Sequence, residues 1–243
     1  MSSVTGDPGE ADGPVIGVVA GSGGAGASSF AAALARAAAA RAGRGLLIDV
    51  DPTGGGIDVL LGIERDPGAR WSGLRLGGGF LEPDALWGGL PRFGPVAVLA
   101  ADTGDLDPAA VGQVIDTGAE LGPVVLDLPR GPTEARDEAA ARCRVVVVVA
   151  RGDLPGLVAA RAALTSLPDV PAGVVVRGGD VDPAQAAGVV GGALLGELPL
   201  ARAGRGGLDP DRLPPSFTAL ARGVLDGLAA PRPGRRLVVL GAA

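Results

Sequence analysis

Residues 15–29 read VIGVVAGSGGAGASS, an apolar run followed at once by a glycine-rich loop. An alanine-rich, helix-forming stretch from Phe30 to Arg41 comes next. A strand, a glycine-rich turn and a helix in this order are typical of a phosphate-binding loop, whose glycines let backbone N–H groups surround the phosphates. The N-terminus of the following helix also favours an anion. The segment therefore predicts a phosphate-binding loop in an α/β protein.

The loop keeps the spacing of the phosphate-binding pattern but lacks its lysine. That pattern is glycine, four residues, glycine, lysine and then serine or threonine. Gly21, Gly26 and Ser28 keep the register, and Ala27 stands where the lysine is expected. We predict that the loop binds phosphate but supports hydrolysis poorly, because the cation that meets the terminal phosphates is missing. The predicted binding residues are Gly21, Ser22, Gly23, Gly24, Ala25, Gly26, Ala27, Ser28 and Ser29.

The missing lysine is a property of the whole chain. The sequence contains no lysine, histidine or tyrosine, so all 21 basic side chains are arginines. This composition excludes Schiff-base chemistry and removes the most common general bases and the most common metal ligand. Any catalysis would depend on carboxylates, hydroxyl groups, arginines, the one cysteine or a bound metal.

Length and composition favour one α/β domain with a large core. A chain of 243 residues rich in alanine, valine and leucine suits helices packed on a parallel sheet. Its net charge of −6 argues against a nucleic-acid partner. Cys143 is the one cysteine, which is typical of a reducing compartment, and we expect its thiol to be packed rather than reactive. With no signal peptide and no apolar stretch of about 20 residues, we predict a cytoplasmic protein without a transmembrane segment, which reaches the membrane only through a partner.

Apolar runs alternate with helix-forming stretches, and this alternation predicts an α/β fold with a single doubly wound, mostly parallel sheet flanked by helices. Strands are expected at residues 15–20, 46–51, 96–101, 124–127, 145–150, 173–177 and 193–198. Helices are expected at 28–42, from Pro108 onward with Asp107 as cap, and at 133–142, 154–167, 183–190 and 216–229. Residues 63–94 are expected to form a long, partly helical connection that Trp71 and Trp87 pin in place.

The ends of the chain differ in composition from its centre. Residues 1–13 are polar and contain glycine, and we expect them to be a disordered leader. Residues 14–230 carry the alternating pattern and are expected to form one domain. Residues 231–243 combine arginines with a short apolar run and are expected to be a tail.

Carboxylates stand at the ends of two predicted strands. Asp49 and Asp51 close the second strand, and Asp127 closes the fourth. Because the carboxyl ends of parallel strands lie along one edge of a sheet, these aspartates should gather beside the loop. In phosphate-binding proteins a strand-end carboxylate and the loop hydroxyl hold Mg²⁺. We therefore predict Ser28, Asp49 and Asp127 as Mg²⁺ ligands. Asp51 would be the catalytic residue, orienting an attacking water, if any hydrolysis occurs.

The same loop also matches a dinucleotide-binding fingerprint, with Gly21, Gly23 and Gly26 following a strand and opening a helix. Asp49 or Asp51 lies where a ribose-binding carboxylate is expected, about 20 residues on. A nicotinamide oxidoreductase would need a proton donor such as tyrosine, lysine or histidine, and the chain has none. A non-catalytic dinucleotide-binding Rossmann module therefore stays open as an alternative.

The motifs together resemble the MinD/ParA group of deviant P-loop ATPases. The likeness covers most of residues 14–230 and is carried by the segments 22–29, 47–52, 55–62 and 125–130. Within the group the chain is similar to actinobacterial CpaE/TadZ-like proteins, also called septum-site-determining (Ssd-like) proteins. The resemblance implies ATP or ADP with Mg²⁺ as the ligand and a homodimer as the assembly. It also implies a Tad-type pilus or secretion ATPase, or the septum machinery, as the partner.

The chain departs from this family at its basic residues. The family's signature lysine, which crosses the dimer interface, falls on Ser22, and its P-loop lysine falls on Ala27. An asparagine that contacts adenine is replaced around Arg177. The resemblance therefore implies a degenerate scaffold, a pseudoenzyme with little ATPase activity. An active ATPase in which Arg130 or Arg151 replaces the lysine is the alternative.

Overall fold

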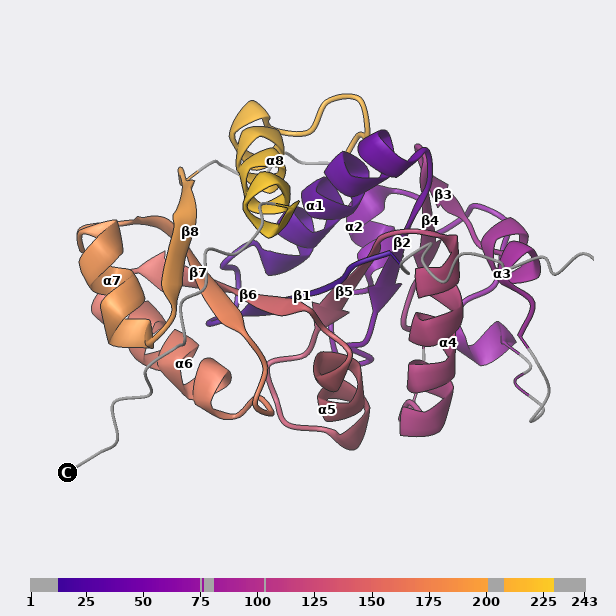
Figure 1. Cartoon of the computed structure of the whole chain (residues 1–243), viewed down its shortest axis with the longest axis horizontal. Coiled ribbons are helices and arrows are strands. Elements are labelled where there is room, and N and C mark those ends of the chain that lie inside the picture. Colours follow the sequence, from indigo (N-terminus) through magenta and orange to yellow (C-terminus); the bar gives the residue numbers. More distant parts are fainter. Residues whose placement is uncertain (1–12, 75, 77–80, 103, 201–207, 230–243) are drawn as a thin grey trace, which may run out of the picture.

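The computed structural model describes residues 13–74, 76, 81–102, 104–200 and 208–229. They form an eight-stranded sheet in the order β3-β4-β2-β5-β1-β6-β7-β8, with helices on both faces (Figure 1). All strand pairs are parallel except that of the edge strand β3 with β4. The predicted doubly wound, mostly parallel sheet is confirmed.

The strands are β1 Val15–Ala20, β2 Gly45–Asp49, β3 Arg92–Phe93, β4 Val96–Leu99, β5 Val124–Leu128, β6 Val145–Gly152, β7 Ala172–Gly179 and β8 Ala193–Leu198. The α-helices are α1 Ala27–Ala42, α2 Ile57–Leu61, α3 Pro83–Gly89, α4 Pro108–Leu121, α5 Glu134–Ala141, α6 Leu154–Thr165, α7 Pro183–Val190 and α8 Pro215–Ala229. A short 3₁₀ helix, η1, spans Trp71–Gly73.

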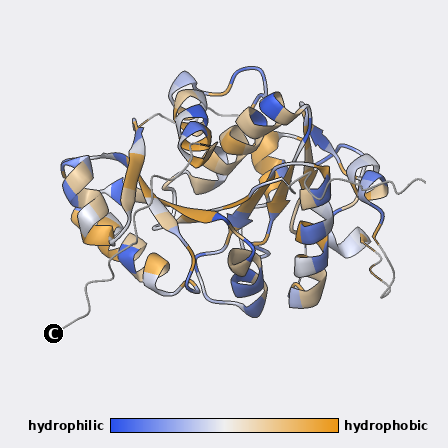
Figure 2. Ribbon diagram, in the orientation of Figure 1, coloured by the Kyte–Doolittle hydropathy of each residue, from blue (hydrophilic) through white to orange (hydrophobic). Residues whose placement is uncertain are grey.

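Two groups of helices bury the two faces of the sheet. Helices α1, α2 and α8 pack on one face, together with Leu47 of β2. Helices α3 to α7 pack on the other face, together with the adjacent residue Ile48, because successive strand residues point to opposite faces. Figure 2 shows the apolar strands between these two layers. A strand buried on both faces must be apolar throughout, which explains the valine runs of β5, β6 and β7.

Helix α1 lies close to the sheet because most of its side chains are alanines. It is buried on nearly all sides, between the sheet and α8. Phe30 in its first turn packs against Phe217 of α8, with ring centroids 6.3 Å apart. This packing fixes the helix N-terminus at the end of β1, where the glycine-rich loop enters it.

Most predicted elements lie within a few residues of the observed ones, and the differences have local causes. Asp107 caps α4 and accepts a hydrogen bond from the N–H of Ala109 at 3.0 Å, as predicted. β2 ends at Asp49 rather than Asp51, because the N–H of Asp51 turns to the Asp49 carboxylate at 2.9 Å. The two-residue edge strand β3 was not predicted. The predicted leader, apart from Gly13, and the predicted tail lie outside the described residues.

The two tryptophans pin the connection between α2 and β4, as predicted. Trp71 is buried, and its Nε1 donates to the carbonyl of Asp49 at 2.8 Å. The guanidinium of Arg44, directly before β2, lies 5.9 Å from the centroid of the Trp87 ring, and that of Arg92 lies 3.9 Å from it. Cys143 is packed as expected, and burial raises the pKa of its thiol to about 12. Within the part of the chain that the structure describes, no helix is long and apolar enough to cross a bilayer.

Candidate functional site

A cavity of about 450 Å³ opens at the carboxyl-terminal edge of the sheet. Its wall consists of the loop after β1, the turn and short helix after β2, and the end of β5. These segments meet because β2, β5 and β1 are parallel neighbours whose carboxyl ends share one edge. The predicted gathering of the loop and the aspartates is confirmed.

Glycine gives the loop after β1 its shape. Gly24 and Gly26 have φ angles of 71° and 88°, in the left-handed region that favours glycine. The N–H of Gly21 donates to the carbonyl of Val149 on β6 at 2.9 Å, which fixes the start of the loop. Helix α1 begins at Ala27 with no side-chain cap bond, so its first N–H groups are available to an anion.

The loop leaves room on the cavity side. A Cβ atom added at Gly23 or Gly24 would meet no atom within 4 Å. At Gly21, by contrast, a Cβ would lie 2.5 Å from the side chain of Ala160 on α6. Gly21 therefore serves close packing against α6, whereas the next glycines keep the cavity open.

Two buried carboxyls stand side by side at the bottom of the site. Asp49 on β2 and Asp127 on β5 are register partners. The pKa of Asp127 is raised to about 8, first by burial and then by the charge of Asp49, while a hydrogen bond from Ser28 opposes the shift. Burial raises the pKa of Asp49 to about 6, against backbone N–H groups that favour its charged form. Because two buried acids are costly to ionise together, the pair favours a bound cation.

Asp49 also closes the turn that follows β2. Its Oδ1 accepts from the N–H of Asp51 at 2.9 Å, and its Oδ2 accepts from the N–H of Ile57 at 3.1 Å. Asp51 lines the cavity, and its Oδ1 accepts from the N–H and hydroxyl of Thr53 at 3.0 and 2.7 Å. The predicted water-orienting residue is therefore held by the turn itself.

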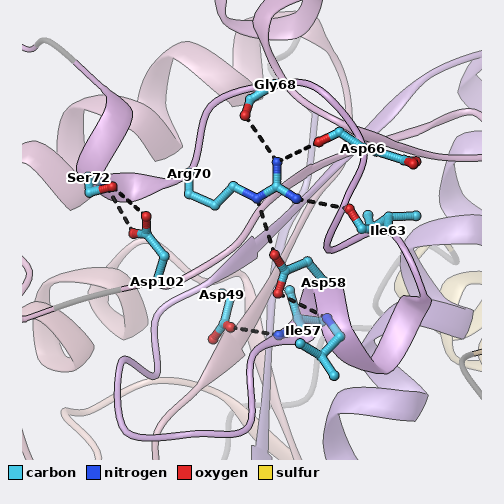
Figure 3. Close-up of polar contacts among 10 residues, drawn as sticks. Asp49, Ile57, Asp58, Ile63, Asp66, Gly68, Arg70, Ser72 and Asp102 are labelled. Atoms are coloured by element: carbon cyan, nitrogen blue, oxygen red, sulfur yellow. Dashed lines mark hydrogen bonds and ion pairs between the residues drawn. The ribbon is translucent and has the colours of Figure 1, made fainter.

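The turn after β2 and the short helix α2 form one rim of the cavity, and Arg70 binds the outer side of this rim (Figure 3). Its Nε donates to the carboxylate of Asp58 at 3.1 Å, and both side chains are 14% exposed. The remaining guanidinium nitrogens donate to the carbonyls of Ile63, Asp66 and Gly68 at 2.9–3.0 Å. Asp58 lies in the first turn of α2, where a carboxylate suits the helix N-terminus. Because α2 lines the cavity, Arg70 holds one wall of the site in place.

Small residues stand at the two positions where the resemblance led us to expect lysines. The Oγ atom of Ser22 is buried and lacks a hydrogen-bond partner among the described residues, and Ala27 is 4% exposed. Of the arginines proposed as substitutes, Arg130 lines the cavity with an exposed side chain. Arg151 instead donates twice to the Asp153 carboxylate, at 3.0 and 2.7 Å, and is not among the residues described at the cavity.

A third arginine reaches the loop, and the sequence did not reveal it as such. Arg177 on β7 donates from Nη1 to the carbonyl of Ala25 at 3.0 Å and to that of Gly24 at 3.4 Å. The sequence placed Arg177 only where an adenine-binding asparagine is expected. Its reach to the loop depends on β6 lying between β1 and β7, a neighbour relation that a single sequence does not contain.

The sheet order contradicts the dinucleotide-binding alternative. In the dinucleotide-binding fold the first and second strands are adjacent, in the order 3-2-1-4-5-6. Here β5 lies between β1 and β2. Asp49 and Asp51 therefore stand one strand further from the loop than a ribose-binding carboxylate would.

Sequence comparison finds relatives that are longer than this chain. No protein-family model matches the sequence. Two uncharacterized proteins, from two strains of Mycobacterium tuberculosis, are each 40% identical to it over 197 residues. The match covers 76% of this chain and 54% of each relative, so the chain spans about half the length of the curated relatives it matches.

Solved structures of MinD and ParA ATPases share the fold. A ParA family ATPase from Chlorobium tepidum matches with a TM-score of 0.69 and 15% identity, covering 90% of this chain and 93% of that one. A chain of the MinC:MinD cell division complex from Aquifex aeolicus matches with a TM-score of 0.70 and 17% identity, covering 92% of this chain and 99% of that one. MinD from Pyrococcus horikoshii, complexed with Mg-ADP, matches with a TM-score of 0.65 and 19% identity, covering 89% of this chain and 96% of that one. The chain therefore has the MinD/ParA-like P-loop fold.

Proposed function

We propose that this chain is a nucleotide-binding positioning protein of the MinD/ParA type, with a degenerate site that binds Mg·ATP or Mg·ADP weakly and hydrolyses it slowly, if at all. One observation carries the proposal. The glycine frame, the helix N-terminus and the Ser28–Asp127 contact surround an open cavity, while small residues occupy both lysine positions.

Loss of the lysine weakens a phosphate site without removing it. The backbone N–H groups and the helix N-terminus do not depend on side-chain identity. One hydrogen bond to a charged group contributes about 1.5–3 kcal/mol. Losing it corresponds to a decrease of roughly 10–100-fold in affinity, so a micromolar site becomes one of roughly tens to hundreds of micromolar.

Ser28, Asp127 and Asp49 are the groups that would hold Mg²⁺. Their donor chemistry fits, since a divalent ion would favour ionisation of the two buried carboxyls, whose pKa values are raised. Within the described residues no group of three histidine, cysteine or acidic side chains forms a metal site alone. Mg²⁺ commonly binds one or two carboxylates together with substrate phosphates and water, which this arrangement allows. Bound there, the ion would neutralise phosphate charge.

Turnover should be near background. Phosphoryl transfer depends on cations that stabilise the charge on the transferring group, and Ala27 supplies none. Asp51 would position a water, but positioning alone contributes little without that charge. We therefore expect the rate of phosphate release from Mg·ATP to be close to the uncatalysed rate and unchanged in Asp51→Ala.

Arg130 supports a second candidate, an ATPase that uses this arginine in place of the lysine. The supporting observation is that Arg130 lines the cavity with an exposed side chain. In that case the wild-type protein would release phosphate from Mg·ATP well above background. Both Arg130→Gln and Asp51→Ala would then abolish the release, whereas background release in the wild type would exclude this candidate.

The proposed cellular role is a scaffold for a Tad-type pilus or secretion ATPase or for the septum machinery. It is supported by the resemblance to CpaE/TadZ-like proteins and by the MinD/ParA-like fold. We propose that the protein works in the cytoplasm as a homodimer and meets the membrane through its partner. A fluorescent fusion in an actinobacterial cell should then concentrate at septa or poles, and uniform fluorescence would contradict this role.

Calorimetry tests nucleotide binding directly. Wild-type protein is titrated with ATP, ADP and NADH, each with and without Mg²⁺. We expect weak, Mg²⁺-dependent binding of ATP and ADP that is reduced in Ser28→Ala, and no preference for NADH. The control is Ser166→Ala, which changes a hydroxyl outside the cavity. Tighter binding of NADH, or no binding of ATP and ADP, would reject the proposal.

A further inference from the structure

The outer face of the phosphate loop carries an arginine. Arg177 lies near the end of β7, and its Nη1 contacts the carbonyls of Gly24 and Ala25. A Cβ atom at Gly26 would clash with that same nitrogen. The guanidinium therefore lies directly against three consecutive residues of the loop. At the third of these, Gly26, the positive φ angle favours glycine, and a larger residue would displace the tip of the arginine side chain.

The arginine and the cavity lie on opposite sides of the loop backbone. In a trans peptide the C=O and N–H groups point in opposite directions. Because Arg177 binds the carbonyl of Ala25, the N–H of Gly26 in the same peptide unit points away from the guanidinium. Gly26 is among the residues described at the cavity, and Arg177 is not. A donor on the carbonyl polarises the peptide unit and strengthens its N–H as a hydrogen-bond donor.

Neighbouring helices hold the arginine in this place. The guanidinium lies 5.8 Å from the ring centroid of Phe217 on α8. Phe217 is buried and packs in turn against Phe30, which lies in the first turn of α1 directly after the loop. Arg177 thus joins β7, α8 and the loop, so its position is determined by the core.

We infer that Arg177 is a positioning residue of the phosphate loop. It holds Gly24 to Gly26 in the anion-binding shape from outside the cavity, and it brings a positive charge to a loop in which Ala27 supplies none. Its effect on the shape of the loop is independent of any ligand, whereas its effect on affinity rests on the proposed function. The two effects can therefore be measured separately.

Hydrogen–deuterium exchange of the ligand-free chain tests the effect on the loop. The variants are Arg177→Gln and Arg177→Lys, with Arg151→Gln as control, because Arg151 is the register partner of Arg177 on β6. In Arg177→Gln we expect peptides covering residues 23–32 to exchange roughly 10-fold faster at the hydrogen-bonded N–H groups of Ala25 and Phe30, while β5 peptides keep the wild-type rate. The loop of Arg177→Lys should exchange at a rate between those of wild type and Arg177→Gln, since a lysine keeps the charge but not the planar guanidinium group. Arg151→Gln should match wild type.

Two results would overturn the inference: loop exchange in Arg177→Gln equal to wild type, or faster exchange throughout the sheet as well as in the loop. If Arg177→Gln does not fold, the exchange rates of Arg177→Lys test the inference instead. Faster exchange confined to the loop supports the inference, and wild-type exchange there contradicts it.

Titration with Mg·ADP then tests the effect on affinity. We expect the affinity of Arg177→Gln to fall roughly 10-fold and that of Arg151→Gln to stay at the wild-type value. Equal affinity in wild type and Arg177→Gln would show that the arginine does not act on the ligand. If the wild-type chain binds no Mg·ADP, the proposed function fails, and the exchange rates still decide whether Arg177 positions the loop.

Discussion

The two segments that bound the cavity are held in different ways. The loop after β1 owes its shape to its backbone, with positive φ angles at Gly24 and Gly26 and carbonyls bound by Arg177. The rim after β2 owes its shape to side chains, with the Asp49 carboxylate closing the turn and the Asp58–Arg70 ion pair holding α2.

This difference separates the shape of the loop from the identity of its side chains. Backbone N–H groups are present whatever the side chains are, so the loop can keep a phosphate-binding shape with Ser22 and Ala27 at the positions where lysines were expected. The rim is held by bonds between its own side chains and backbone. The loop should therefore be sensitive to changes at glycine, and the rim to changes of charge.

The largest effect is expected at Gly26. Replacement by alanine forces a side chain into the left-handed region, at a cost of about 1–2 kcal/mol, and displaces Arg177 from its carbonyls. With about one further hydrogen bond to a charged group lost, the free energy of unfolding should fall by about 3 kcal/mol. Urea denaturation measures it. Gly23→Ala, where the space is open, is the control and should change stability by less than about 0.5 kcal/mol.

A smaller loss of stability is expected from a substitution at the rim. Arg70→Ala removes the ion pair with Asp58 and three carbonyl contacts, which should lower the free energy of unfolding by about 2 kcal/mol. The control is Arg65→Ala, because Arg65 is 94% exposed and lies 4.0 Å from Glu64. Such an exposed pair contributes less than about 1 kcal/mol. Equal effects of the two substitutions in urea denaturation would contradict the role of Arg70.

The buried carboxyls predict a pH dependence of the ligand-free protein. The pKa of Asp127 is raised from 3.8 to about 8, so between these pH values the unfolded chain loses a proton that the folded chain keeps. Stability therefore falls as pH rises through this range, because the folded state binds more protons. Asp127→Asn should raise the free energy of unfolding at pH 8 by about 1 kcal/mol or more, with no gain near pH 4.

The control for this pH dependence is Asp169→Asn, which changes an exposed aspartate and should give no gain at either pH. A gain in Asp127→Asn that persists unchanged at pH 4 would show that the effect is not one of ionisation.

The smallest effect is expected on assembly. Moving a dimer from about 1% to 99% populated requires about 5.5 kcal/mol of differential ligand binding. A loop with Ser22 and Ala27 in place of both lysines is not expected to supply it. The molar mass measured by light scattering should therefore be the same with and without saturating Mg·ATP. A shift from monomer to dimer on adding Mg·ATP would show that a nucleotide switch survives.

Most of the fold could be predicted because its signals are local. The valine run of β6 and the Asp107–Pro108 start of α4 are each encoded within a few residues. The edge strand β3 could not be predicted, because two residues carry no periodicity and pair only through contact with β4. The strand order was not predicted, because pairing between strands far apart in the sequence leaves no local signal.

The loop and its aspartates were predictable for the same reason, whereas the partners of those residues were not. The register of Asp49 with Asp127 follows from strands that lie about 80 residues apart in sequence, as parallel pairing allows. The contacts of Arg177 with the loop depend on tertiary neighbours. Those of Arg70 lie within a short stretch of chain but follow no sequence motif. Arg151 was a reasonable candidate at a strand end, but the nearby Asp153 binds its guanidinium.

Introducing a lysine at position 27 tests most directly whether the phosphate site lacks only a cation. Wild type, Ala27→Lys and the uncharged control Ala27→Met are titrated with Mg·ADP by calorimetry. A lysine at this position should raise the affinity roughly 10–100-fold, because the backbone frame is already in place. Ala27→Met should bind no more tightly than wild type. A folded Ala27→Lys protein whose affinity for Mg·ADP equals that of wild type would contradict the claim.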